Sequence, residues 1–234
     1  MILMGKRKYF LVLDVEATRP CHVYDIGIAI IDRHCNIYHT ESFVVKDIFS
    51  DLQDMSSAYY KSKIPKYLDS LYCKEHIPEQ FFAIREIALG LIEQYEIDTV
   101  CAYNVSYDVR VLNTTIAYLT KGRITEYFPE HINFWDIYTM ACQVIATQKN
   151  YIKTAIREGW ISSKGNMQVK AEYVYKYISD NYAFEEEHTG LQDVLIEIAI
   201  LDKAFRQHKK MTKGIIGNPW RLCQPKYQEY INTL

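Results

Sequence analysis

Two acidic residues, Asp14 and Glu16, end a short apolar run and stand two positions apart. On a regular strand this spacing directs both side chains to the same face. Two like charges so close are costly without a cation between them, and carboxylate oxygens are the ligands that hard divalent cations prefer. Such cations can hydrolyse a phosphodiester by activating water and by stabilising charge on the phosphate and the leaving oxygen. Alone, an Asp-x-Glu sequence occurs about once in a chain of this length, so solvated acids in a turn explain the pair equally well.

Two further acids and a histidine make a metal-binding site the better interpretation. Asn104-Val-Ser-Tyr-Asp108 sets a third carboxylate where an apolar strand gives way to a helix, and His188 and Asp193 stand five positions apart at another helix start. Taken singly, Asp108 and Asp193 are first-turn acids favoured by the helix dipole, and His188 is a surface residue. The ordered set of five argues against coincidence and predicts one metal-binding hydrolytic site.

The elements that must position these residues alternate in type along the chain. Apolar runs rich in β-forming residues predict strands at Tyr9–Val15, Val23–Asp32, Asn36–Val45, Thr99–Tyr103 and Ile132–Trp135. Apolar spacings of three and four predict helices within Ser56–Tyr95 with Ile77-Pro78 as a start, at Tyr107–Leu119, after the cap Asp136, and from the capping box at Thr189 to about Arg206. The order predicts an α/β fold, a mixed five-stranded sheet flanked by helices.

Length and composition favour one catalytic domain. The 234 residues, 49% hydrophobic and 24% charged, are enough to bury a full core. We expect this domain to cover residues 1–212. Residues 213–234, with Gly214, Gly217, Pro219 and Pro225, are expected to be an irregular tail packed on the domain. The formal net charge of -2 excludes a protein that coats duplex nucleic acid, so any nucleic acid must be held locally.

Cysteine usage and hydropathy indicate a reduced, cytoplasmic protein without a membrane partner. The six cysteines never form C-x-x-C, no signal-peptide pattern is present, and no apolar window is long enough to span a bilayer. Cys21, His22, Cys35 and His39 lack the close pairing of structural zinc ligands. They are better interpreted as strand and turn residues.

The chemistry-bearing residues resemble a known family. Asp14-x-Glu16, Asn104-x-x-x-Asp108 and His188-x-x-x-x-Asp193 are similar to the three motifs of the DEDDh (DnaQ-like) exonucleases, which include the proofreading subunit of bacterial replicative polymerase and ribonuclease T. Tyr24-Asp25-Ile26-Gly27 resembles the family's second strand, and Ile198, Ala199 and Leu201 continue its last motif helix. The resemblance covers residues 9–205. The stretch Lys170–Ile178 before Glu185-Glu-Glu-His188 resembles phage-encoded or prophage-encoded members, which would place the protein in a host cytoplasm.

Several positions depart from the family pattern. Ala17-Thr18-Arg19 stands where the family often has Thr-Thr-Gly, which puts a close backbone approach in doubt and offers Arg19 as a phosphate contact. Tyr103 replaces a frequent His, Tyr107 a frequent Phe, and Gly190 a common Ala. None of these changes removes a metal ligand or the base.

The resemblance implies a ribonuclease H-like sheet and a metal-dependent 3′–5′ exonuclease that releases 5′-monophosphates from single-stranded DNA or RNA. It assigns Asp14, Glu16 and Asp193 to one Mg²⁺ or Mn²⁺ ion with its attacking water, Asp14 and Asp108 to a second, and His188 to the general base. A histidine's pKa near neutrality suits that role. The expected substrate-binding residues are Ala17, Thr18, Arg19, Asn104 and Tyr107. Asn104 is expected to brace the site rather than to touch metal.

Other interpretations stay open at this point. A proofreading subunit would dock on a DNA polymerase, for which the basic run Lys203–Lys213 is a candidate, although a solvated helix end explains that run more simply. A non-catalytic nucleic-acid-binding module would be marked by a missing acid, yet all five positions are filled. Tyr59 and Tyr60, with Tyr103 and Tyr107, could stack on the bases of a single strand, although most tyrosines line cores and surfaces. DNA is favoured over RNA on the resemblance alone, and a homo-oligomer stays open.

Overall fold

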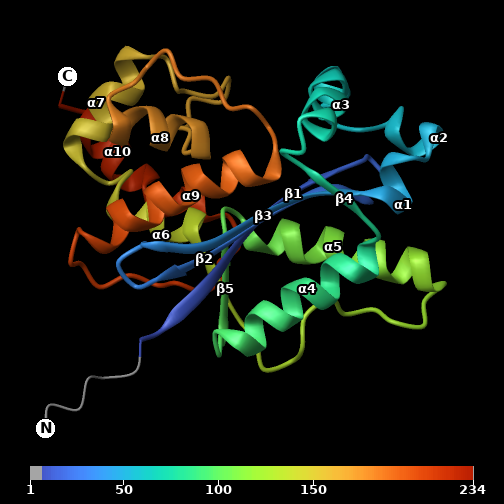
Figure 1. Ribbon diagram of the computed structural model, residues 1–234. Coiled ribbons are helices and arrows are strands. Elements are labelled where there is room, and N and C mark those ends of the chain that lie inside the picture. Colours follow the sequence, from blue (N-terminus) through green and yellow to red (C-terminus); the bar gives the residue numbers. More distant parts are fainter. Residues whose placement is uncertain (1–6, 234) are drawn as a thin grey trace, which may run out of the picture.

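The computed structural model describes residues 7–233 and has a mixed sheet at its centre (Figure 1). The strands are β1 (Tyr9–Ala17), β2 (Val23–Asp32), β3 (Ile37–Val45), β4 (Ile77–Glu79), β5 (Thr99–Ala102) and β6 (Asn133–Asp136). They lie in the order β4-β3-β2-β1-β5-β6. The meander β1-β2-β3 is antiparallel, whereas β5 runs parallel to β1 and β6 parallel to β5. The predicted α/β fold with a mixed sheet is confirmed, with one strand more than expected.

The additional strand corrects the interpretation of Ile77-Pro78 as a helix start. Both residues lie in β4, which pairs parallel with β3 at the edge of the sheet, and the helix that follows begins at Phe81. A residue before proline is driven to extended backbone, and proline, lacking an N–H, is tolerated on an edge strand. The same two residues therefore suit a short edge strand.

Helices cover both faces of the sheet (Figure 1). They are α1 (Lys46–Phe49), α2 (Leu52–Met55), α3 (Ile64–Tyr72), α4 (Phe81–Gln94), α5 (Val105–Thr120), α6 (Ile137–Val144), α7 (Lys149–Arg157), α8 (Ala171–Ser179), α9 (Gly190–Phe205) and α10 (Gln224–Ile231), with 3-10 turns η1 (Lys61–Lys63) and η2 (Pro219–Leu222). Helices α4 and α5 lie on one side of the sheet, and α6, α8, α9 and α10 gather on the other. None of the helices in the described chain is long and apolar enough to cross a bilayer.

Strand β1 shows why its sequence is an unbroken apolar run. Leu11, Leu13 and Val15 pack in the apolar cluster on the α4–α5 side, whereas Phe10 and Val12 pack in the cluster that includes α6 and α9. Successive side chains point to opposite faces, and both faces are covered, so every position is apolar. Asp14 continues the row of Phe10 and Val12, which directs its carboxylate to the α9 side.

The C-terminal segment differs from the irregular tail that was expected. Residues 213–218 contain no helix or strand, but η2 and α10 follow, and Cys223 and Tyr227 are buried in the cluster that includes α6 and α9. Pro219 and Pro225, interpreted as breakers, occupy the first turns of η2 and α10. Proline suits that position because its missing N–H has no partner there and its φ is already helical.

Candidate active site

A cavity of about 470 Å³ gathers the five residues singled out by the sequence. Asp14 and Glu16 reach it from the end of β1, Asp108 from the first turn of α5, His188 from the loop before α9, and Asp193 from the first turn of α9. The rest of the wall includes two further acids and several aromatic rings, namely Glu186, Glu197, Tyr59, Tyr60, Tyr103 and Tyr107. Three distant parts of the sequence thus converge on one place.

The start of α9 is fixed by an unusually close contact with β2. A Cβ atom on Gly27 would lie 2.1 Å from the backbone carbon of Gly190, and one on Gly190 would lie 2.4 Å from the backbone nitrogen of Gly27. Only two glycines allow this approach. Because Gly27 pairs with Asp14 across the sheet, the contact brings α9, and with it Asp193, up to the acidic end of β1.

The cap of α9 differs from the predicted capping box. Thr189 is the N-cap residue, but its side chain makes no capping hydrogen bond. Instead, a buried carboxylate oxygen of Asp25 accepts the Gly190 N–H at 2.8 Å and the Tyr67 hydroxyl at 2.6 Å. The same hydroxyl lies 3.3 Å from the carbonyl oxygen of His188. Asp25 therefore supplies the cap from β2 and helps to hold the backbone that carries His188 and Asp193.

Asp108 is positioned by a bend at the end of β5. Asn104 adopts a left-handed conformation, with φ of 69°, and α5 begins directly after it. The Asn104 N–H donates to Asp136 at 2.9 Å, while the other oxygen of Asp136 accepts the Thr139 N–H at 3.2 Å. Asp136 is thus the predicted cap of α6, and it also joins the ends of β5 and β6 beside the site.

The acids repel one another in a poorly hydrated place. Burial, followed by repulsion from neighbouring carboxylates, raises the pKa of Asp14 to about 8 and that of Asp193 to about 10, and it raises the pKa of Glu16 and Asp108 well above their usual range. Carboxyl groups in this condition remain neutral unless positive charge joins them.

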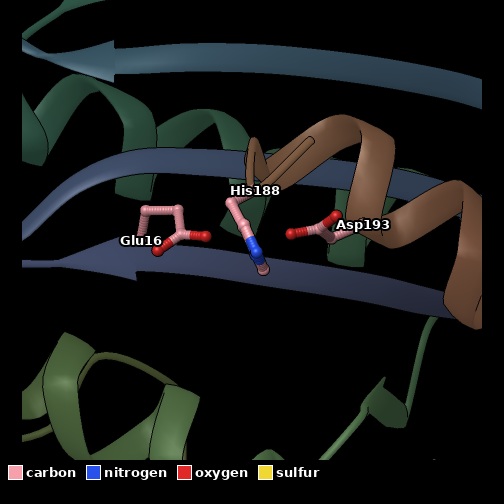
Figure 2. A group of neighbouring side chains, drawn as sticks. All are labelled: Glu16, His188 and Asp193. Atoms are coloured by element: carbon pink, nitrogen blue, oxygen red, sulfur yellow. The ribbon is translucent and has the colours of Figure 1, made fainter. Parts of the chain in front are cut away.

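Unpartnered oxygens show that the site suits a cation. Within the described residues, one oxygen each of Asp108, Asp193 and Glu197 is buried without a hydrogen-bond partner. Glu16, His188 and Asp193 each offer one ligand atom, and these atoms lie within 4.8 Å of one another. Figure 2 shows the three side chains pointing toward one another. Hard oxygen donors, unsatisfied and mutually repelling, fit a divalent cation such as Mg²⁺ or Mn²⁺.

His188 is held at the mouth of this cluster. Its ring stacks on Tyr60 with centroids 3.8 Å apart and planes at 10°, and its Nδ1 lies 3.7 Å from a carboxylate oxygen of Glu186. Burial, followed by repulsion from Lys63, lowers the pKa of His188. The imidazole is therefore neutral, and able to accept a proton, at neutral pH.

Two acids of the cavity were missed by the sequence reasoning. Glu197 lies one helical turn after Asp193, a spacing that places both on one face of α9 and could have indicated it. One of its oxygens accepts the Tyr103 N–H at 2.9 Å. Glu186 stands two residues before His188 in an acidic run that carried no positional signal, and burial raises its pKa to about 7.

Of the five expected substrate-binding residues, one lines the acidic cavity and four do not. Tyr107 lines the acidic cavity, whereas Asn104 is exposed and lines a neighbouring one. Ala17 and Thr18 are buried, and Thr18 forms a β-bridge with Ala58. Arg19 is exposed, and its N–H donates to the Ser57 carbonyl oxygen at 3.1 Å. Here Thr18 and Arg19 attach the end of β1 to the segment that carries Tyr59 and Tyr60.

The four residues considered for zinc do not come together. Cys21 and His22 precede β2, and Cys35 follows it at the far end of this ten-residue strand. All six cysteines are free.

Comparison with known proteins supports the fold. No family model and none of the curated proteins matches the sequence. Among solved structures, the chain is similar to exonuclease I in complex with the inhibitor BCBP, with a TM-score of 0.52 and 17% identity over 98% of this chain and 44% of the other. For E. coli exonuclease I in complex with a 5cy-dT13 oligonucleotide, the TM-score is 0.47 and the identity 16%, over 97% and 43% of the two chains. The chain spans less than half the length of either protein, and at this identity the likeness to the first of them shows a shared mixed α/β fold and no more.

Proposed function

We propose that this protein is a metal-dependent 3′–5′ exonuclease of the DEDDh type that removes 5′-mononucleotides from single-stranded DNA or RNA. The observation that carries the proposal is the convergence of Asp14, Glu16, Asp108 and Asp193 with a neutral His188 in one cavity. A ribonuclease H-like fold shared with an exonuclease agrees with it. The fold alone would not assign a function, so the proposal is based on the donor set in the cavity.

Asp14, Glu16, Asp108 and Asp193 are the residues that would hold two divalent cations. When bound, the cations supply positive charge that stabilises the phosphate and lowers the pKa of water. With cations held there, these residues would place the scissile phosphodiester at the end of β1. In the absence of cations, the raised pKa of each acid keeps the cluster largely protonated.

His188 is the residue that accepts the proton of the attacking water. Its Nδ1 is turned toward Glu186, which leaves Nε2 as the accepting atom. Stacking on Tyr60 holds the ring at the cavity wall, so Tyr60 acts as a positioning residue. A base must come within hydrogen-bond reach of the proton that it removes. A ring nitrogen of His188 lies close to a carboxylate oxygen of Glu16 and to one of Asp193.

The cavity is suited to an unpaired strand. Tyr59, Tyr60 and Tyr107 line it, and aromatic rings bind bases by stacking without regard to sequence. The net charge of -2 indicates that the phosphates are held mainly at the metal-binding acids rather than by an extended basic surface. The choice between DNA and RNA depends on contacts to the 2′-hydroxyl.

End-labelled oligonucleotides of DNA and RNA, incubated with Mg²⁺ or Mn²⁺, test the proposal. A 5′-label should give a ladder that shortens from the 3′ end, and a 3′-label should appear at once in a 5′-mononucleotide. Products that carry 3′-phosphates, or shortening from the 5′ end, would contradict it. Activity should disappear in EDTA and return when Mg²⁺ or Mn²⁺ is added in excess.

A matched pair of variants separates the site from general effects. Asp108→Asn keeps the volume of a buried site residue and should abolish cleavage in a folded protein. Asp51→Asn makes the same chemical change at the exposed N-cap of α2 and should leave cleavage unchanged. Equal activity of the two variants would show that the acidic cavity is not the active site.

A further inference from the structure

A second cavity, of about 590 Å³, adjoins the acidic one. Tyr103 and Ala171 line both, so the two cavities share a wall. The outer side is built from residues 162–171, which precede and begin α8, and from Trp220 in η2. A volume of about 300–1,000 Å³ is typical of sites that bind small molecules or cofactors.

Three aromatic residues, Tyr103, Tyr138 and Trp220, line this second cavity. Tyr103 stacks on Tyr138 with centroids 5.1 Å apart, and its hydroxyl donates to the Val169 carbonyl oxygen at 2.6 Å. Trp220 is half-buried and belongs to neither apolar cluster of the described chain. The guanidinium carbon of Arg221 lies over this ring, 5.4 Å from its centroid, and the ring also lines the cavity, where it can contact a planar ligand.

Polar groups in the same cavity have capacity to spare. Among residues 7–233, the side-chain amides of Asn166 and Gln168 make no hydrogen bond with the protein. The backbone around them is fixed, because Gln224 both accepts the Met167 N–H at 3.1 Å and donates to its carbonyl oxygen at 2.9 Å. An amide offers one acceptor and two donors, which matches the hydrogen-bonding edge of a nucleobase.

The charge of the lining also separates the two cavities. Lys170 is the single charged residue among those that line the second cavity in the described chain, whereas six carboxylates line the first. An anionic strand that leaves the acidic cavity on this side meets no further negative charge.

We propose that the second cavity binds the nucleobase of a nucleotide upstream of the scissile phosphodiester. This inference rests on the proposed exonuclease function. The terminal nucleotide has its own aromatic partners, Tyr59, Tyr60 and Tyr107, in the acidic cavity. The next part of the strand crosses the shared wall at Tyr103, stacks its base on Trp220, and meets the amides of Asn166 and Gln168.

Trp220→Ala tests this subsite with two substrates. The methyl ester of thymidine 5′-monophosphate contains the terminal nucleotide with a one-carbon leaving group that cannot fill the second cavity, whereas an oligothymidylate of about ten nucleotides fills both cavities. Loss of one stacking ring should raise KM for the oligonucleotide about fivefold to a hundredfold. KM for the ester should not change. Trp220→Phe should largely restore oligonucleotide binding, and Tyr72→Ala, which removes an aromatic ring that is 90% exposed on α3, is the matched control.

An unchanged KM for the oligonucleotide, or an equal rise for both substrates, would overturn the upstream assignment. Binding of a 5′-fluorescein oligothymidylate, followed by anisotropy with Ca²⁺ in place of Mg²⁺, keeps the two proposals distinct. If the wild-type protein cleaves neither substrate but binds the strand in a Trp220-dependent way, the exonuclease proposal fails and the second cavity stands as a nucleobase-binding site. If binding is the same with and without Trp220, the subsite fails. Gln168→Ala, which removes a partly exposed amide, should weaken binding in the same direction if Trp220→Ala proves unstable.

Discussion

The contact between Gly27 and Gly190 allows a sharp test of how the site is positioned. Gly27→Ala adds one methyl group in the middle of β2, where the new Cβ would lie 2.1 Å from the Gly190 carbon, 2.2 Å from the Leu191 nitrogen and 2.3 Å from the Gly190 oxygen. All three are backbone atoms of the first turn of α9. No rotation of a side chain can relieve the overlap, so the helix must move away from the strand.

The size of the effect follows from these distances. Ordinary contact between carbon atoms begins near 3.5 Å, so the first turn of α9 must shift outward by about 1 Å or more. Overpacking of this kind typically costs about 1–3 kcal/mol of the free energy of unfolding. Because Asp193 lies in that turn, its carboxylate moves with it. A displacement of about 1 Å at a reacting centre can lower the rate about a hundredfold.

Gly90→Ala is the matched control for Gly27→Ala, because a Cβ at Gly90 meets no atom within 4 Å. It adds the same methyl group inside α4 and should stabilise the protein by about 0.5–1 kcal/mol, with no change in rate. Urea unfolding and the single-turnover rate on a labelled oligonucleotide would be measured for both variants. If Gly27→Ala loses stability but keeps the wild-type rate, the glycine contact does not position Asp193 for catalysis.

Three further predictions concern the acids, the histidine and the cap. The folded protein holds the pKa of Asp14 at about 8, far above about 3.9 in an unfolded chain, so it retains a proton that the unfolded chain releases. The melting temperature in EDTA should therefore fall as the pH rises from about 5 to about 8. Mg²⁺ should raise the melting temperature most at the higher pH. A melting temperature that rises with pH in EDTA would contradict this. His188→Ala should lower turnover about a hundredfold to ten-thousandfold. In a single-turnover pH profile, it should also flatten the rise of the rate with pH that the wild type shows below about 6.5. A variant that loses mainly metal affinity would show that His188 is a metal ligand and not the base. Asp136→Ala removes the cap of α6 and leaves the Asn104 N–H without its acceptor, so it should lower the free energy of unfolding by about 2–4 kcal/mol. Asp51→Ala, which removes an exposed cap, should lower it by about 1 kcal/mol. Equal losses in chemical denaturation would refute the role of Asp136 in holding Asn104.

The elements that local pattern can specify were predicted well. Strands β1 and β2 are largely apolar runs of nine and ten residues, and their register places Asp14 opposite Gly27, with its irregularity only between Glu16 and Ala17. Helix α9 was placed within one residue at each end, because the residues from Thr189 onward mark its start. The ends of these elements meet at one cavity, which is why the convergence of the four acids and His188 could be predicted.

What the sequence could not specify depends on contacts between distant residues. The N–H of Gly190 is capped by Asp25, 165 positions earlier, whereas local pattern suggested the adjacent Thr189. Strand β4 has three residues, too few for a periodic signal, and exists because β3 offers an edge. A proline occurs both where a helix is broken and where a helix begins, so Pro219 and Pro225 do not distinguish the two from sequence. Only the packing of Cys223 and Tyr227 on the core decides between them.

The basic run Lys203–Lys213 shows how packing can account for a charged segment. Lys213 lies over the ring of Trp135, with its Nζ 3.9 Å from the centroid, and its carbonyl oxygen accepts the Asp136 N–H at 2.6 Å. Lys213 therefore attaches the C-terminal segment to β6, and its side chain contacts the protein's own surface. Docking on a polymerase therefore gains no support from this end of the run.

Tyr103 explains how a departure from the family pattern can be accommodated beside the acids. Its N–H donates to Glu197, its hydroxyl to the carbonyl oxygen of Val169, and its ring stacks on Tyr138. Burial raises the pKa of its hydroxyl well above the usual value, so this side chain has no acid–base role near neutral pH. A ring held at three points is a rigid wall, and both cavities use it. Glu197, buried on the same face of α9 as Asp193, thus acts on both cavities at once: it adds negative charge to the acidic one and fixes the wall of the other.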